Sequence, residues 1–444
     1  MGDAIVTTLA NRTGKGPDAV PFQNPGAGLS AEEFIDRIIA LRPMIRAQQE
    51  AADENGGYVR EVHEALLEFG GYFALQPKRY GGHEFDVSTF LRASIEMARS
   101  DPGSGWCYTF AAGHVPMIAG HFSKETQDAI FARNNGLVLA PLRAPTGGTI
   151  RKVEGGYVVN GTWDFGSGMA YATHVMPTAR LIEDGVAGPP NFLVPLIPIE
   201  DVKVLWDSWG KGQTMGLQAS ASHTFVVENV FVPANMVTSM YAFQRSGELT
   251  EGSPGARLHG NPLYLGLTTS YFSSTIASCM VGCAWAALDA LEEILRTRRT
   301  VNPPFDLRMK SPDYQQPFGD ALMYAKGADA CMMEYARQYQ KMLDDWSRGI
   351  PLTAERDFAA SALTTQAARQ AVKAVEICFY AGGSSSTLKG GRLNRYFRDM
   401  AMYRTHPIAQ YHTAAIGFAE GYLGLPIPML EAVGGSRSGA RPKL

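Results

Sequence analysis

The sequence of 444 residues has few cysteines and lacks the motifs that mark several common enzyme classes. Its five cysteines lie scattered in apolar surroundings, which is typical of buried reduced thiols in a cytosolic chain. Cys279 and Cys283 have helical spacing, but no nearby histidine or cysteine pair completes a zinc site, so no metal centre is expected. There is no Gly-x-Gly-x-x-Gly after a strand, no Walker sequence, no His-Glu-x-x-His and no Gly-x-Ser-x-Gly. These absences argue against a Rossmann site, a P-loop, a zinc protease and a serine hydrolase of the common types.

The sequence also has no excess charge of one sign and no long uncharged apolar run. Forty Lys and Arg oppose 43 Asp and Glu, a net charge of −3, so no basic field exists to attract nucleic acid. We expect no membrane helix and no signal peptide. With 45% hydrophobic and 19% charged residues, the composition is that of a soluble globular protein, which we expect to be cytoplasmic.

The first third of the chain divides into an arm and a helical region. Residues 1–29 are rich in Gly, Pro, Asn and Thr without periodicity, which predicts a mobile arm. Ser30 followed by Glu33 is a capping box, because each side chain can satisfy a free amide at a helix start. An N-terminal helical domain is therefore predicted over residues 30–136, with helices over 58–69 and 86–99 and another starting near 105.

Turn signals and short alternating runs dominate residues 137–240, which are predicted to form a β domain. The Asn160-Gly161 pair favours a tight hairpin. Strands are expected over residues 157–161, 174–181, 191–198, 202–205 and 223–232.

Long apolar-faced helical patterns return after residue 240. A four-helix bundle is predicted over residues 241–427, followed by a tail over 428–444. Small residues along its first helix permit close helix packing and are also typical of oligomer interfaces. The whole order predicts a mostly helical α+β fold. The expected helices span residues 264–298, 313–346, 354–380 and 404–424.

Three clusters of residues suit chemistry, one in each region. Residues 106–117 place His114 in an apolar helix start, residues 163–169 surround Ser167, and residues 395–407 combine charges with a histidine. Each also has a purely structural interpretation. These are a core histidine bonded to the backbone, a strand with a bulge, and a solvated charged helix end.

The clusters occur in the order found in a known superfamily. Over residues 30–425 the chain resembles the acyl-CoA dehydrogenase superfamily. That resemblance implies a helical N-terminal domain, a central β-barrel or sandwich and a C-terminal four-helix bundle. The motifs are Leu67-x-x-Gly70-x-x-Phe73-x-Leu75-x-Pro77-x-x-Tyr80-Gly81-Gly82, Asn160-Gly161-x-Trp163-x-Phe165-x-Ser167-Gly168, Phe225-Val-Val-x-x-Val230-Phe231-Val232-Pro233, and Gly382-Gly383 followed by Arg398-Asp399 and His406.

The base that such dehydrogenases need is missing. In them an acid follows a pair like Arg398-Asp399, but residues 400–408 contain no acid, nor does the alternative location at residues 263–274. Without a carboxylate the α-proton of an acyl thioester cannot leave. The pattern instead resembles the group D flavin monooxygenases. These are oxygenase components of two-component systems, such as 4-hydroxyphenylacetate 3-hydroxylase and the dibenzothiophene monooxygenase.

That resemblance implies a cofactor, partners and roles. Reduced FMN, with FAD as the alternative, would come from a separate flavin reductase and form a C4a-hydroperoxide with O2. That adduct would oxygenate a small organic substrate, expected to be aromatic. Ser167 would lie near flavin N5, His406 near the peroxide and His114 on the substrate side. The bundle is expected to build a homo-oligomer, a tetramer by family resemblance.

Further residues follow from the same resemblance. The serine that some phenol hydroxylases carry has no counterpart in residues 140–145, where Arg143 is either an exposed loop residue or a contact for an anionic substrate. N- and S-oxygenation therefore stay open. So do an FAD-dependent acyl-CoA dehydrogenase or oxidase and a non-catalytic binding protein. The expected cofactor contacts are Trp163, Phe165, Ser167, Trp206, Gly383 and, for the phosphate, Arg296 or Arg299; the expected substrate contacts are His114, Trp106 and Arg143.

Overall fold

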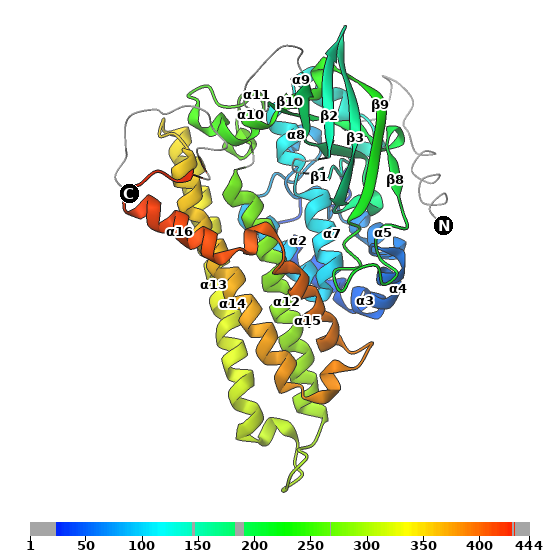
Figure 1. Ribbon diagram of the computed structural model, residues 1–444, viewed down its shortest axis with the longest axis vertical. Coiled ribbons are helices and arrows are strands. Elements are labelled where there is room, and N and C mark those ends of the chain that lie inside the picture. Colours follow the sequence, from blue (N-terminus) through cyan, green and yellow to red (C-terminus); the bar gives the residue numbers. More distant parts are fainter. Residues whose placement is uncertain (1–23, 144–146, 183–190, 267, 429, 431–444) are drawn as a thin grey trace.

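The computed structural model describes residues 24–143, 147–182, 191–266, 268–428 and 430 (Figure 1). The predicted arm lies mostly outside these residues, as does the predicted tail. The capping box is confirmed, because Ser30 Oγ accepts the Glu33 N–H and the Glu33 carboxylate accepts the Ser30 N–H. The N-terminal helices are α2 (Ala31–Ala40), α3 (Arg42–Ala47), α4 (Gln49–Asn55), α5 (Arg60–Glu68), α6 (Val87–Ser100), α7 (Pro102–Ala112), α8 (Val115–His121) and α9 (Lys124–Phe131).

The strands form one sheet of seven and one of three. The large sheet has the order β10-β6-β5-β2-β3-β9-β8, and the small sheet has the order β1-β4-β7. They share a core of their own around Trp163, Phe225 and Val227. The strands are β1 (Leu142–Arg143), β2 (Gly148–Val153), β3 (Gly156–Gly166), β4 (His174–Pro177), β5 (Ala179–Ile182), β6 (Phe192–Pro195), β7 (Ile197–Pro198), β8 (Lys203–Leu205), β9 (His223–Pro233) and β10 (Val237–Ser239).

The predicted hairpin at Asn160-Gly161 is wrong. The chain turns earlier, between Val153 and Gly156, and β3 continues through Asn160-Gly161 with a register shift against β9. Gly161 is required there for close approach, since an added Cβ would lie 2.5 Å from the Gly147 oxygen. The glycine therefore marks a bulge in the strand.

Two predicted strands are each split by the structure. Residues 174–181 divide into β4 and β5, and residues 191–198 divide into β6 and β7. In both cases the chain passes from one sheet to the other, because β4 and β7 pair in the small sheet while β5 and β6 pair in the large one. Alternation along the sequence continues through such a change of sheet and does not reveal it.

The C-terminal region contains the predicted bundle with one correction. The helix expected over residues 404–424 begins only at Tyr411, as α16, and a separate helix that was not predicted, α15, ends before it at Tyr403. Pro407 lies between them and cannot donate a backbone hydrogen bond to a continuing helix. The helices are α10 (Met240–Arg245), α11 (Pro254–His259), α12 (Thr269–Thr297), α13 (Pro312–Ser347), α14 (Ala354–Ala381), α15 (Arg392–Tyr403) and α16 (Tyr411–Tyr422).

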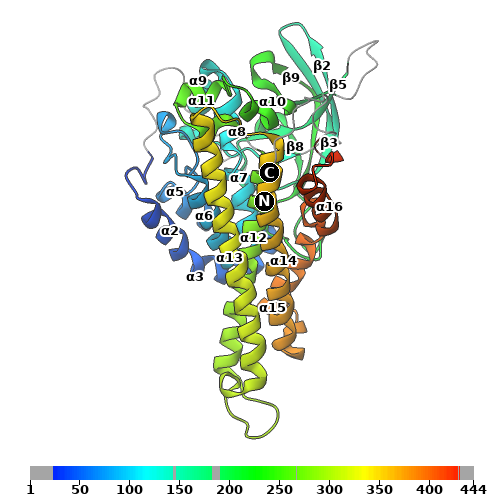
Figure 2. The ribbon, with the colours of Figure 1, turned by 90° about the vertical axis from the view of Figure 1, so that its left-hand side faces the viewer.

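The N-terminal helices and the bundle share one hydrophobic core, while the β domain has its own. Gly282 allows α12 to contact the backbone of α6 at Ile95. By length and composition α12 is able to cross a membrane, which the sequence analysis did not anticipate, and 89% of its apolar window is buried in the protein. The bundle projects well beyond the other two regions, and α16 crosses its outer side (Figures 1 and 2).

Candidate active site

Aromatic side chains follow one face of α7 and end in a histidine. Trp106, Phe110 and His114 have i, i+4 spacing, so they lie on one side of the helical path. Trp106 stacks on Phe110 with ring centroids 4.6 Å apart, and Phe110 meets His114 edge-on at 5.8 Å. Phe272 of α12 lies 5.9 Å from His114. These four residues, here called the aromatic row, form a continuous cluster of rings.

His114 is a neutral imidazole in this row. It is 3% exposed, and burial lowers the pKa of its ring to about 4. Its Nδ1 accepts the Leu142 N–H at 3.2 Å, which assigns the proton to Nε2. The backbone bonding expected of a core histidine is therefore present, and the same ring also borders the aromatic row.

His406 reaches the other end of the row from the turn after α15. Its ring meets Trp106 edge-on at 5.9 Å, beside Tyr403, whose ring lies 5.1 Å from Trp106. Burial, and then the nearby Arg143 cation, lower the pKa of His406 to about 4. The structure thus brings His114 and His406 to one row of rings, and both are neutral at pH 7.

Phe165 is held in an uncommon conformation at the end of β3. Its φ is +59°, in the left-handed region that is costly for an aromatic residue, and its side chain is 57% exposed. The pairing of β3 with β9 shifts register between Trp163 and Gly166, so the predicted bulge is present. Trp209 meets the Phe165 ring edge-on at 5.8 Å. The bulge turns a large ring out of the sheet.

Ser167 and Gly168 join this strand end to α7. Ser167 Oγ is 2.8 Å from Ser222 Oγ, which is 2.7 Å from Ser220 Oγ, so a chain of hydroxyls orients it. Gly168 has a φ of +86°, and an added Cβ would lie 2.9 Å from the Ala111 nitrogen. Ser167 is therefore fixed beside the helix that carries the aromatic row.

Arg143 adds a positive charge to the same region. Its Nε donates to the Asp164 backbone oxygen at 2.6 Å, next to Phe165. The Asp164 carboxylate acts electrostatically on Arg143, and the Arg143 cation in turn acts on His406. Arg143 is therefore a half-buried cation at the edge of the row.

Two predicted flavin contacts lie in the β domain, Trp163 inside its core and Trp206 beside His223, which pairs with Gly166 at the end of β3. Trp163 is 2% exposed, stacks on Phe225 at 5.4 Å and donates its indole N–H to the Thr178 oxygen at 3.1 Å. It supports β3 from inside the β core. Trp206 meets His223 edge-on at 5.1 Å. The structure does not bring either of them into contact with the aromatic row.

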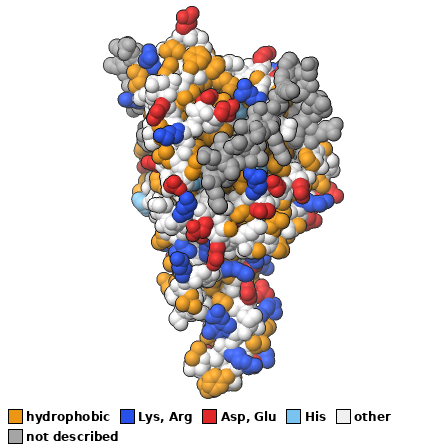
Figure 3. Space-filling model, turned by 90° about the vertical axis from the view of Figure 1, so that its right-hand side faces the viewer, with side chains coloured by type: hydrophobic (Ala, Val, Ile, Leu, Met, Phe, Trp, Pro, Cys, Tyr) orange, Lys and Arg blue, Asp and Glu red, His pale blue; other side chains and the backbone are white. Residues whose placement is uncertain are grey.

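The remaining predicted cofactor residues lie at the far end of the bundle, here called the bundle tip (residues 296–310 and 382–392). Arg296 pairs with Glu292 at 2.8 Å, Arg299 donates to the Phe305 oxygen at 2.9 Å, and Gly383 is exposed. This tip is remote from the β domain of its own chain (Figure 1). Figure 3 shows Lys and Arg side chains along the lower bundle and an apolar end.

Sequence reasoning missed two arginines of the bundle tip. Arg298 donates to Ser385 Oγ, and Arg308 donates to the Gly382 oxygen at 3.4 Å. Both therefore converge on the Gly-Gly-Ser-Ser-Ser turn at residues 382–386. The serine run beside a glycine pair, together with the arginines at residues 296–299, is the signal that could have identified them.

The chemistry of these residues fits a flavin. A flat heteroaromatic ring suits the aromatic row and the exposed Phe165 ring, and its polar edge suits the Ser167 hydroxyl and two neutral imidazoles. A phosphate suits arginines beside a serine turn, as at the bundle tip. No group of three or more His, Cys, Asp or Glu side chains capable of holding a metal occurs among the described residues.

Comparisons with known proteins agree with this assignment. Residues 274–411 match the family described as acyl-CoA dehydrogenase, C-terminal domain. The chain is 27% identical to the flavin-dependent monooxygenase, oxygenase subunit HsaA, of Rhodococcus jostii, over 88% of this chain and 99% of that protein. It is 24% identical to the oxygenase component of p-hydroxyphenylacetate 3-hydroxylase of Acinetobacter baumannii, over 87% and 88%.

A solved structure shows the same fold. XiaF from Streptomyces, in complex with FADH2 and glycerol, superposes with a TM-score of 0.79 over 89% of this chain and 96% of that one, at 21% identity. The chain is therefore a homologue of the oxygenase components of flavin-dependent monooxygenases, built on the acyl-CoA dehydrogenase fold.

Proposed function

We propose that this chain is the oxygenase component of a two-component monooxygenase and receives reduced FMN from a separate flavin reductase. The observation that carries the proposal is the pair of neutral imidazoles, His114 and His406, on one aromatic row where a dehydrogenase would need a carboxylate base. Bound reduced flavin supplies two electrons and activates O2. One oxygen atom enters the substrate and the other leaves as water.

The environment of Asp399, the last acidic residue before His406 in the sequence, supports an oxygenase over a dehydrogenase. Asp399 is 2% exposed, and its Oδ1 accepts the Leu217 N–H at 2.6 Å. Its carboxylate lies beside Arg395, 4.0 Å from Nε. An acid bound in this way is poorly placed to abstract a proton from a substrate carbon.

The chain's residues bind the flavin, orient it and exclude water. Phe165 would present its ring to the cofactor, and Ser167, oriented by Ser222, would offer its hydroxyl to the polar edge of the flavin ring near N5. His406 offers a hydrogen bond from a site with little water, which favours a long-lived oxygenated cofactor. Trp163 supports β3 from inside the β core.

The substrate we infer is a small aromatic molecule with an anionic group, a carboxylate or a phenolate. Trp106 and Phe110 offer ring faces for stacking, and His114 offers a neutral imidazole to position a substrate hydroxyl. Arg143 offers a positive charge close to them. Product analysis decides between oxygenation at carbon, nitrogen and sulfur.

We also propose that the bundle tip completes the flavin site of a neighbouring subunit in a homotetramer. This tip is remote from its own β domain but carries Arg296, Arg298, Arg299 and Arg308 around the Gly383 turn. Exposed apolar side chains there, Val301 at 76% and Leu388 at 63%, suit burial against a second copy. Free thiols throughout support a cytoplasmic location.

A stopped-flow experiment tests the proposed function. The anaerobic protein is mixed with reduced FMN or reduced FAD and then with O2. We expect a transient absorbance distinct from those of reduced and oxidised flavin, and tighter binding of reduced than of oxidised flavin. Direct conversion to oxidised flavin would contradict the proposal. Bleaching of tightly held FAD by an acyl-CoA would support the dehydrogenase alternative that the matched C-terminal family suggests.

A further inference from the structure

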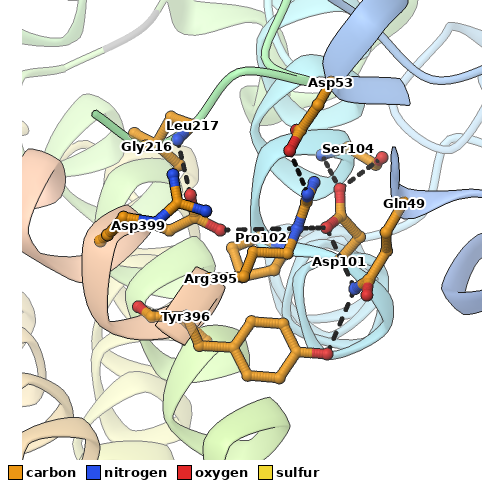
Figure 4. A network of polar contacts seen from close by, with 12 residues as sticks. Gln49, Asp53, Asp101, Pro102, Ser104, Gly216, Leu217, Arg395, Tyr396 and Asp399 are labelled. Atoms are coloured by element: carbon orange, nitrogen blue, oxygen red, sulfur yellow. Dashed lines mark hydrogen bonds and ion pairs between the residues drawn. The ribbon is translucent and has the colours of Figure 1, made fainter. Parts of the chain in front are cut away.

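A buried charge network lies on α15, between the bundle and the other two regions (Figure 4). Arg395 and Asp399 are one helical turn apart and are 7% and 2% exposed. The sequence alone suggested a solvated helix end for this run, and that interpretation is wrong for both residues. A buried arginine and aspartate need specific partners, because unpaired burial costs several kcal/mol.

Arg395 fixes the beginning of α7. Its Nε donates to Asp101 Oδ1 at 2.8 Å, and its Nη1 bonds to the Asp53 carboxylate. The other oxygen of Asp101 accepts the Ser104 N–H at 2.9 Å and so caps α7. Trp106, the first residue of the aromatic row, lies just after this cap.

Asp399 fixes the segment Trp209–Gln218, here called the cover loop. Its carboxylate accepts the Leu217 N–H. The preceding loop residue, Gly216, donates its N–H to Met402 Sδ at 3.0 Å. Arg398 donates to the Met215 oxygen. Three successive loop residues are therefore bound to one face of α15.

The cover loop also touches the candidate active site. Trp209 donates its indole N–H to the Leu217 oxygen at 3.0 Å and meets the ring of Phe165 edge-on. One chain of contacts therefore runs from Asp399 through Leu217 and Trp209 to Phe165, and a second runs from Arg395 through Asp101 to α7.

We propose that Arg395 and Asp399 are positioning residues for the flavin reaction, which hold the cover loop and the start of α7 at a fixed separation. This inference rests on the proposed function. It predicts that loosening Asp399 frees the loop, lets water reach the cofactor and shortens the lifetime of the oxygenated flavin.

The network holds more negative than positive charge. One guanidinium serves Asp53, Asp101 and Asp399, and burial raises the pKa of Asp399 to about 7 against the opposing effect of Arg395. The Asp399→Asn variant therefore carries the same charge at this position as the wild type below pH 7 and a different charge above pH 7. The groups that face Asp399 are Arg395 and Tyr403 on α15, Asp101 before α7, Asp53 on α4 and Cys283 on α12.

Limited proteolysis of the flavin-free protein tests the anchoring without any flavin chemistry. Lys211 is exposed in the cover loop, so trypsin cleavage there reports how often the loop detaches. We expect Asp399→Ala and Arg398→Ala each to speed cleavage at least tenfold. Asp399→Asn should match the wild type at pH 6 and separate from it at pH 8. The matched control is Asp329→Asn, which breaks the Arg92 ion pair away from the loop.

The second measurement is hydrogen peroxide release from reduced FMN and O2, which should rise in the same variants and in the same order. Faster cleavage together with faster peroxide release supports the proposal. Unchanged cleavage in both Asp399→Ala and Arg398→Ala overturns it, and so does faster cleavage with wild-type peroxide release. If the wild type gives no transient flavin species, the proposed function fails, while the cleavage comparison still decides whether α15 holds the loop.

Discussion

At the scale of single residues, His114 and His406 illustrate how burial selects the form of an imidazole. Loss of water lowers the pKa of each ring to about 4, and for His406 the Arg143 cation lowers it further. At neutral pH each ring can therefore accept at one nitrogen and donate at the other without carrying charge. Such groups orient polar partners but are weak bases toward a proton on carbon. This agrees with an oxygenase rather than with a dehydrogenase.

Replacement of His406 tests this role. We expect His406→Ala to shorten the lifetime of the oxygenated flavin at least tenfold, because a hydrogen-bonding group is lost and water gains access. Stopped-flow absorbance measures that lifetime. His412→Ala is the matched control, since His412 is exposed on α16. An unchanged transient in His406→Ala would remove this residue from the mechanism.

Phe165 allows binding to be separated from backbone strain. Glycine adopts a φ of +59° without cost, so Phe165→Gly should unfold about 1 kcal/mol less readily than Phe165→Ala. Both variants lose the ring and should bind reduced flavin about tenfold more weakly, on the order of one stacking contact. Urea unfolding and flavin titration measure the two effects. Equal stabilities would show that the backbone relaxes at this position.

The order of motifs in the sequence predicts part of this site. Ser167, His114 and His406 come from three regions, and the structure places all three around α7. Trp163 and Phe165, two residues apart, would share one face of a regular strand, but the bulge between Trp163 and Gly166 leaves Trp163 in the β core and turns Phe165 out. Arg298 and Arg308 escaped notice because their common partner, the turn at residues 382–386, is distant in the sequence.

At the scale of elements, the contact between the end of β3 and α7 joins Ser167 to the helix that carries the aromatic row. Gly168 makes it possible by lying against the backbone of α7 at Cys107 and Ala111. The long helices were predicted from periodicity, but α15 was not. Helix ends and strand pairings were predicted less well, because a change of sheet after β4 and the break at Pro407 depend on tertiary partners.

A pair of glycine variants tests the packing at this contact. Gly168 and Gly349 both have a φ of +86°, but only at Gly168 would an added Cβ meet neighbours. Gly349→Ala should therefore cost about 1 kcal/mol from strain alone, and Gly168→Ala about 2–4 kcal/mol from strain and displacement. Denaturant unfolding gives both values. Flavin affinity should fall in Gly168→Ala only, and an equal loss in both variants would contradict this account.

At the scale of the whole molecule, the buried histidines make the fold sensitive to acid. Burial lowers the pKa of His114, His174, His223 and His406 to about 4 and that of His121 to about 3, below the ordinary value of 6.5. The unfolded chain therefore takes up these protons first as the pH falls. The raised pKa values of Asp53, Asp357 and Asp399 act in the opposite direction, but the histidines outnumber these carboxyls.

The free energy of unfolding should accordingly fall as the pH drops from 6.5 to 4. Each imidazole contributes at most on the order of 3 kcal/mol to this loss. Urea unfolding at several pH values measures it, and His174→Gln should flatten the curve because one of the five groups is then absent. A stability that stays constant between pH 6.5 and 4.5 would show that the histidines gain partners for their charged form.

Mixed oligomers test whether the bundle tip serves a neighbouring subunit. The double variant R298A/R308A should bind flavin poorly, and His406→Ala should fail in the oxygen reaction. Co-expression of the two should restore part of the activity, because an intact cleft from one chain then meets an intact tip from the other. Activity no higher than the sum of the separate variants would assign each tip to its own chain.

The division of the apolar interior has a consequence for biosynthesis. The helices before the β domain bury their faces against α12 and its neighbours, more than a hundred residues further along the chain. During translation these helices can pack on one another, as α2 and α7 pack on α6, but the face that α12 covers stays exposed, whereas the strands can close on themselves. The nascent first third therefore keeps an exposed apolar face, of the kind that chaperones bind, until the last third leaves the exit tunnel.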